Sequence, residues 1–361
     1  MIQERYPTLV EDPSRSNSAV LILDQTRLPR EAVMLRLASL EDAANAIRVM
    51  QVRGAPLIGA AAAYGVALGL SDDAGDARLA QVIDNLAATR PTAVNLHWAL
   101  GRMRRVLQES APATRREQAW QEARAIAAED RAANAMIGQH GLALIAAIHA
   151  DLRSRIGYSP DPLSGKGGDN GSQATPAIVN VMTHCNAGRL ATVEHGTALA
   201  PVYAAHAAGL RVHVWVSETR PRNQGLLTAW ELAEAGVPHT LIVDNAAGLL
   251  LMRGLVDLIL VGADRIAANG DVANKVGTYL KGLAARAHGV PFYVAAPLST
   301  IDYCCPSGAA IPIEERAAQE LGAGDVAVAN PAFDLTPAAL ISGIISERGI
   351  AGAGELKLWL R

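Results

Sequence analysis

The spacing of apolar residues divides the chain into two parts, and the first part is predicted to be mainly helical. Apolar positions recur with a helical period in residues 40–50, and the alanine-rich stretches 117–131 and 134–148 show the same pattern. Residues 57–70 form the longest apolar run. It is shorter than the ~20 residues that cross a bilayer, so we expect a buried helix there. Residues 20–24 are predicted to form a strand of an N-terminal hairpin.

From about residue 176 onward, short apolar runs alternate with helical stretches. Gly209, Gly236 and Gly289 follow three of these stretches, as C-terminal caps do. Such alternation is typical of a doubly wound parallel sheet. The predicted strands are residues 177–182, 212–216, 240–243, 258–261, 291–295 and 326–328, and the predicted helices include 197–208, 227–235 and 275–287.

The expected fold class is therefore α/β, with a parallel-sheet domain preceded by a smaller, mainly helical domain. Residues 156–175 contain Gly, Ser, Pro and Asp and almost no apolar side chains, which indicates a loop at a domain boundary. We expect a helical N-terminal domain with a small β element over residues 1–150 and a sheet domain over residues 151–361. A chain of 361 residues is long enough for two such domains.

Polar residues gather directly after the predicted strands. Cys185 follows the first strand, and Asp264 follows the fourth. Because the carboxyl ends of parallel strands meet at one edge of a sheet, we expect these side chains to line one crevice. Asn274 and Lys275 are predicted to open the next helix. An acid beside an Asn-Lys helix start suggests proton chemistry next to a bound anion.

Helix capping is the alternative explanation for polar residues at strand ends. We expect Asp244 and Ser299 to cap the helices that follow them. Capping explains Cys185 poorly, because cysteine is a weak cap.

The segment Arg53-Gly54-Ala55-Pro56 is a candidate anion site in the N-terminal part. Proline suits the first turn of a helix, and glycine lets a ligand approach the backbone. Free N–H groups at the helix start and the Arg53 guanidinium would both favour an anion. An ordinary loop-to-helix start is the alternative at this position.

Composition narrows the classes of function. The net charge is −3 and the charges are mixed, so no basic surface for nucleic acid is expected. The cluster at residues 102–105 is interpreted as a solvated helix face. The first residues lack an apolar signal segment, and the three cysteines show neither zinc spacing nor a disulfide framework. We expect a reduced, cytoplasmic protein with no metal or redox cofactor and no membrane partner.

Seven motifs in order make the chain resemble the methylthioribose-1-phosphate isomerases, the aldose–ketose isomerases of methionine salvage. Their superfamily also contains regulatory subunits of the initiation factor two-B exchange factor and ribose-1,5-bisphosphate isomerases. The motifs extend over nearly the whole chain: Arg53-Gly-Ala-Pro56, Arg90-Pro-Thr-Ala-Val-Asn95, Thr183-His-Cys-Asn-Ala-Gly188, Glu218-Thr-Arg-Pro221 with Gln224-Gly225, Gly262-Ala-Asp-Arg265, Asn269-Gly-Asp-Val-Ala-Asn-Lys275 and Asn330-Pro-Ala-Phe-Asp334.

The resemblance implies a Rossmann-like domain after a helical domain, a homodimer, and a sugar 1-phosphate as substrate. It implies Cys185 and Asp264 as the catalytic pair. A shorter segment after Gln224 and a long loop at residues 157–174 depart from the family pattern, so the group on C5 of the sugar stays open. The substrate contacts that it implies are Arg53, Gly54, Ala55, Arg90, Gln224, Asn274 and Lys275.

A buried carboxyl group can keep its proton near neutral pH, so Asp264 is expected to donate a proton to the sugar. Cys185 would be its proton-transfer partner or would stabilise charge in the transition state. A hydrolase pair of Cys185 with His184 is disfavoured, because adjacent strand residues face opposite sides.

Two competing functions stay open at the level of sequence. One is an isomerase of 5-deoxyribose 1-phosphate or ribose 1,5-bisphosphate. The second is a non-catalytic exchange-factor subunit, although such subunits tend to lose the cysteine and aspartate that this chain keeps at Cys185 and Asp264.

Overall fold

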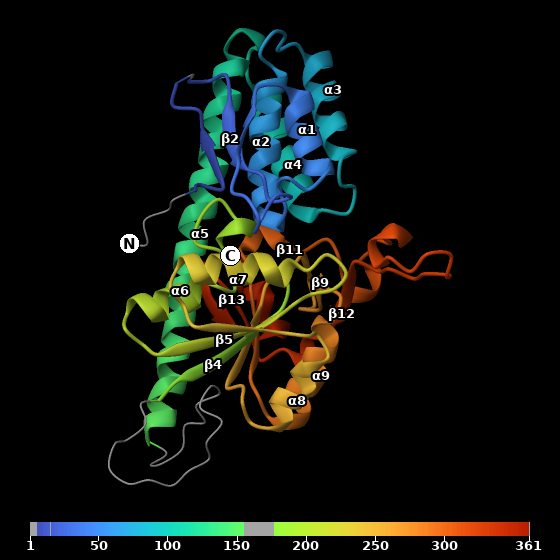
Figure 1. Cartoon of the computed structure of the whole chain (residues 1–361). Coiled ribbons are helices and arrows are strands. Elements are labelled where there is room, and N and C mark those ends of the chain that lie inside the picture. Colours follow the sequence, from blue (N-terminus) through green and yellow to red (C-terminus); the bar gives the residue numbers. More distant parts are fainter. Residues whose placement is uncertain (1–5, 15, 155–176, 361) are drawn as a thin grey trace.

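The computed structural model describes residues 6–14, 16–154 and 177–360. The predicted loop at residues 156–175 lies outside them. Figure 1 shows a helical part stacked on a sheet part, with one long helix running beside both. The α/β class and the helical first part are confirmed.

The helical part begins with a small antiparallel sheet that includes the predicted strand near residue 20. Helix α2 is its centre, and every residue from Pro56 to Gly69 is buried. A helix can be buried all round only if its surface is apolar, which the alanine-rich sequence provides. The elements are β1 (Leu9–Glu11), β2 (Val20–Leu23), β3 (Met34–Leu37), α1 (Leu40–Arg48), α2 (Ala55–Gly69), α3 (Asp76–Ala87) and α4 (Val94–Glu109).

Helix α5 (Pro112–Ser154) is continuous, so the prediction of two helices over 117–131 and 134–148 was wrong. The residues between them include Ala132 and Ala133, which do not interrupt a helix. Trp120 packs in the core of the helical part, and Ile145 packs in the core under the sheet. Among the described helices, α5 is the one long and apolar enough to cross a membrane, which is weak evidence for a span.

The sheet part contains a seven-stranded sheet in the order β14-β13-β10-β7-β4-β5-β6, parallel except for β14. Five predicted strands are confirmed, but residues 326–328 form no strand. Val326 is 69% exposed, so that short apolar run has no sheet to pack against. The strands are β4 (Val179–Thr183), β5 (Val212–Ser217), β6 (His239–Ile242), β7 (Leu258–Val261), β10 (Phe292–Ala295), β13 (Gly343–Ser346) and β14 (Gly349–Ala351).

Helices follow most of the parallel strands, and Gly209, Gly236 and Gly289 adopt positive φ at helix ends, as predicted. Helices α8 and α9 pack together at the end far from the helical part (Figure 1). The helices are α6 (Ala200–Ala207), α7 (Gln224–Glu234), α8 (Ala246–Met252) and α9 (Thr278–His288), with short 3-10 turns at η1 (Arg189–Ala191), η2 (Leu298–Thr300), η3 (Gly308–Ala310), η4 (Ala318–Leu321), η5 (Ala338–Leu340) and η6 (Ala353–Leu360).

Asn274 and Lys275 do not open a helix, so that prediction was wrong. They end β9, where they pair with Asp334 and Phe333 of β12 in antiparallel register. Helix α9 starts only after Gly277, which has φ 103°. These strands belong to a second, four-stranded sheet formed by β8 (Arg265–Ala267), β9 (Val272–Lys275), β11 (Ile301–Asp302) and β12 (Phe333–Thr336).

Candidate active site

A cleft lies where the helical part meets the carboxyl ends of the parallel strands. Its empty volume is about 910 Å³, including the open mouth. All nine residues singled out from the sequence line it: Arg53, Gly54 and Ala55 at the start of α2, Arg90 before α4, Cys185 after β4, Gln224 at the start of α7, Asp264 after β7, and Asn274 and Lys275 on β9.

The backbone holds Cys185 in a left-handed conformation, with φ 67°. Its N–H donates to Thr219 Oγ1 at 2.9 Å, and its carbonyl accepts from Thr228 Oγ1 at 2.8 Å. Burial raises the pKa of the thiol, while Lys275 and Arg53 act in the opposite direction. Cys185 therefore enters the cleft as a neutral thiol that two hydroxyl groups hold in place.

Asp264 follows β7 and is fixed by a backbone hydrogen bond from its N–H to the carbonyl of Ala273, at 2.9 Å. Burial raises the pKa of its carboxyl group, and Lys275, Arg90 and Arg53 lower it by a smaller amount. A carboxyl group with a raised pKa keeps its proton to higher pH and can act as a general acid.

Arg53 is held by Asn186, whose side-chain and main-chain oxygens both accept from its guanidinium. The Asn186 amide in turn donates to Thr228 Oγ1, at 3.1 Å, and to Glu231. Glu231 is fully buried, and burial raises the pKa of its carboxyl group. Arg53 Nε is buried and has no hydrogen-bond partner among the described residues, which leaves one donor for a ligand.

Gly54 and Ala55 place the start of α2 in the cleft. Gly54 has φ 91°, and a Cβ built on it would lie 2.4 Å from the Cα of Ala191. Only glycine fits this close approach without backbone movement. No side chain among the described residues caps the helix, so its first N–H groups and its dipole are available to an anion.

Three further polar side chains carry donors or acceptors toward the cleft. Lys275 Nζ donates to the carbonyl of Ala332 at 3.0 Å and lies 4.6 Å from the centroid of the Phe333 ring. Arg90 donates to Glu314 at 3.3 Å, while its Nε and Gln224 Oε1 are buried and unpaired within the described part of the chain. The cleft thus combines cations and open hydrogen-bonding groups with a thiol and a carboxyl group whose pKa values burial raises.

Asn274 has a structural partner beside this set. Its side-chain amide donates to Thr278 Oγ1 at 3.0 Å and is 4% exposed. That hydrogen bond ties the end of β9 to the first turn of α9. The same turn is held from β12, where Asp334 accepts from the N–H groups of Gly277 and Tyr279.

Both capping predictions were wrong. The carboxylate of Asp244 accepts from the N–H groups of Thr219 and Arg220, both at 2.8 Å, so it shapes the loop after β5. Ser299 lies inside η2 and accepts from the Asn95 amide at 3.0 Å. Each of the two residues connects segments that are distant in sequence. The capping rule considers only the helix that follows directly, so it cannot predict such contacts.

His184 forms no nucleophile pair in this arrangement. Its Nε2 contacts the carbonyl of Val276 at 2.8 Å, and burial holds the pKa of the imidazole well below its ordinary value.

Several residues that line the cleft were not predicted from the sequence. Most of them are apolar or hold neighbouring groups in place. They include Met50, Asn186, Thr197 and Phe333. In the described part of the chain no group of three His, Cys, Asp or Glu residues could hold a metal ion.

Comparison with known proteins agrees with this architecture. A model of the initiation factor 2 subunit family matches residues 51–352. A protein of Dechloromonas aromatica named methylthioribose-1-phosphate isomerase is 58% identical over 96% of this chain and 94% of its own length. One of Acidiphilium cryptum with the same name is 52% identical, over 97% and 93%.

Solved structures show the same relation. The 5-methylthioribose 1-phosphate isomerase of Pyrococcus horikoshii superimposes with a TM-score of 0.82 at 38% identity, over 99% of this chain and 96% of that one. The translation initiation factor eIF-2B subunit delta of A. fulgidus gives 0.76 at 35% identity, over 98% and 97%. The resemblance noted in the motifs is confirmed, and the chain belongs to the initiation factor 2 subunit family.

Proposed function

We propose that this protein is an aldose–ketose isomerase that converts 5-methylthioribose 1-phosphate to 5-methylthioribulose 1-phosphate in methionine salvage. The proposal is supported most directly by the composition of the cleft. Cys185 and Asp264 share it with an uncapped helix start and several cations, and burial raises the pKa of both acidic groups. The names of the relatives support the same substrate. The cytoplasmic location expected from the sequence is part of this proposal.

The phosphate is assigned to the start of α2 and the cations around it. Arg53 and Arg90 each have a buried Nε without a partner in the described structure, and the helix start offers free N–H groups. Guanidinium groups and helix starts both favour phosphate oxygens. Lys275 adds a point charge at the same wall.

The phosphate ester prevents the sugar ring from opening to a free aldehyde. In the proposed reaction, the Asp264 carboxyl group gives its proton to the ring oxygen as the bond from that oxygen to C1 breaks. Hydrogen then moves from C2 to C1, as a hydride or as a proton through an enol. The 2-hydroxyl group returns its proton to the Asp264 carboxylate as the C2 carbonyl forms, so protons and electrons balance.

Cys185 is assigned to the hydrogen-transfer step. Its neutral thiol, held after β4, can act as a weak donor to the charge that develops during a hydride shift. In the enol route the thiol must first lose its proton, and the thiolate then takes the proton from C2 and returns it to C1. The step needs no electron acceptor outside the sugar, because C1 is reduced as C2 is oxidised.

The test is a coupled assay of methylthioribose 1-phosphate, 5-deoxyribose 1-phosphate and ribose 1,5-bisphosphate with the wild type, Asp264→Asn and Cys185→Ser. We expect the highest kcat/KM for methylthioribose 1-phosphate. Loss of a general acid typically costs about 10²–10⁴-fold in rate, and both variants should lose that much. Cys305→Ser is the matched control, because Cys305 is a free, buried thiol outside the cleft. Near wild-type turnover by folded Asp264→Asn would contradict the assignment.

We also propose that the protein works as a homodimer, as the resemblance implies. Four large apolar side chains are exposed on the neighbouring helices α8 and α9, and burial against a second copy would remove them from water. They are Leu249, Met252, Leu280 and Leu283, which are 40–62% exposed. The molar mass of the purified protein, measured by light scattering, tests this assembly.

A further inference from the structure

A second, smaller cavity adjoins the cleft, and its walls are highly charged. Its empty volume is about 360 Å³, and it shares Met50, Arg90, Gln224, Lys275 and Phe333 with the cleft. We call it the mouth cavity. The arginines Arg222 and Arg316 and the glutamates Glu314 and Glu320 complete its charged wall.

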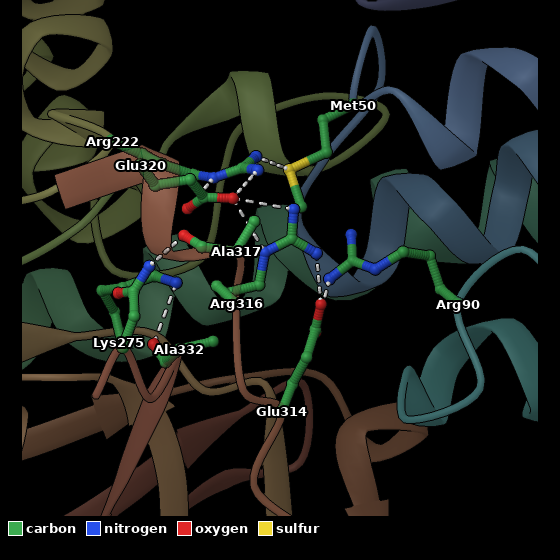
Figure 2. Close-up of polar contacts among 10 residues, drawn as sticks. Met50, Arg90, Arg222, Lys275, Glu314, Arg316, Ala317, Glu320 and Ala332 are labelled. Atoms are coloured by element: carbon green, nitrogen blue, oxygen red, sulfur yellow. Dashed lines mark hydrogen bonds and ion pairs between the residues drawn. The ribbon is translucent and has the colours of Figure 1, made fainter. Parts of the chain in front are cut away.

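Three arginines and two glutamates alternate along this wall (Figure 2). Glu314 accepts from Arg90 at 3.3 Å and from Arg316 at 2.5 Å. Glu320 accepts from Arg316 at 3.1 Å and from Arg222 at 2.8 Å. The chain of ion pairs therefore joins the helical part, the loop after β5 and the irregular segment before β12.

Once a sugar 1-phosphate is bound, each cation of this wall would have a negatively charged partner. In the proposed function, Arg90 and Lys275 face the phosphate on C1. The two arginines that remain, Arg222 and Arg316, are balanced by Glu314 and Glu320. The hydrogen bond from Arg222 lowers the pKa of Glu320 to about 2, so its carboxylate is ionised at any working pH.

We propose that the mouth cavity takes the 5-substituent of the sugar, and that Glu314 and Glu320 are specificity-determining residues that exclude a second phosphate from it. Met50 and Phe333 also border this space. The Met50 sulfur accepts from Arg222, and Lys275 Nζ lies 4.6 Å from the centroid of the Phe333 ring. Both cations are therefore already engaged, which suits an uncharged substituent. A phosphate on C5 would meet two carboxylates whose arginines are already paired. Specificity of this kind comes from a repulsive element built against the competing ligand.

The inference rests on the proposed function and deepens it. The test compares kcat/KM for ribose 1,5-bisphosphate with kcat/KM for methylthioribose 1-phosphate in Glu320→Gln, Glu314→Gln and the wild type. Each substitution frees an arginine for the second phosphate, so the ratio should rise on the order of tenfold. Arg222→Gln should lower the ratio, because it leaves the Glu320 carboxylate less balanced.

The matched control is Glu315→Gln, which removes one negative charge from the same segment. Glu315 lines neither cavity and accepts from the N–H of Asn330. Its ratio should equal that of the wild type. An unchanged ratio in Glu320→Gln and Glu314→Gln would overturn the inference, as would equal rises in all three glutamine variants. Failure of the proposed function is distinct, because the wild type would then not turn over methylthioribose 1-phosphate.

Discussion

Replacement of Gly54 by alanine should damage both stability and phosphate binding. Gly54 has φ 91° and ψ 135°, a backbone conformation that residues other than glycine rarely adopt. Holding alanine there costs about 1–3 kcal/mol. The new methyl group would also lie 2.4 Å from the Cα and 2.5 Å from the carbonyl oxygen of Ala191. Such overpacking costs typically about 1–3 kcal/mol, because backbone atoms must move.

The expected loss is therefore about 2–6 kcal/mol in the free energy of unfolding, measured by urea denaturation. The strain displaces the start of α2, so KM for the sugar 1-phosphate should rise by at least about tenfold in protein that remains folded. Gly236→Ala is the matched control, since Gly236 has φ 68° and no atom of the described residues lies within 4 Å of a Cβ added there. It should lose about 1–2 kcal/mol and keep its KM. Equal effects of Gly54→Ala and Gly236→Ala on stability and KM would refute the role of close contact with Ala191.

Two further predictions concern the acids and their supports. Asp264→Asn should be more stable than the wild type above pH 3.8, the ordinary pKa of the carboxyl group. In the wild type, burial raises the pKa of Asp264 in the folded state, so the free energy of unfolding falls as the pH rises from the ordinary pKa through the raised one. Asparagine has no such proton to lose. Thermal unfolding of both proteins should coincide near pH ~3 and separate by several degrees near pH ~8, and wild type as stable as the variant at high pH would contradict this. Asn186→Ala removes the side-chain acceptor that holds Arg53, and charged hydrogen bonds contribute about 1.5–3 kcal/mol, so KM should rise about 10–100-fold. An unchanged KM with a lowered melting temperature would assign Asn186 a purely structural role.

The position of the cleft could be predicted because its residues stand at places that topology brings together. Cys185 and Asp264 follow strands of one parallel sheet, so their strand-end positions predicted that they share an edge. The start of α2 was also readable, since Gly54 and Pro56 mark a helix start. Asn274 and Lys275 line the expected cleft even though their secondary structure was predicted wrongly.

The mouth cavity could not be predicted in the same way. Glu314 and Glu320 lie in a segment of turns and short 3-10 helices, without a period that fixes where a side chain points. Their partners Arg90 and Arg222 are 224 and 98 residues away, respectively. Only the folded chain shows that these charges alternate along one wall. For the same reason, the contacts of Asp244 and Ser299 differ from the predicted caps.

The division into domains at residue 150 stays a prediction. Helix α5 crosses that position, and its two halves pack in different cores. The long helix therefore belongs physically to both parts. Its continuity over Ala132 and Ala133 also explains why the alanine-rich pattern gave no sign of where one core ends and the next begins.

The most direct test of the proposed function is product formation from methylthioribose 1-phosphate by the wild type, Asp264→Asn, Cys185→Ser and the control Cys305→Ser, at equal concentrations of folded protein. We expect methylthioribulose 1-phosphate from the wild type and from Cys305→Ser. Each of the two cleft variants should form it at a rate lower by about 10²–10⁴-fold. Wild-type protein that forms no ketose, or an Asp264→Asn variant that forms it at the wild-type rate, would contradict the central claim.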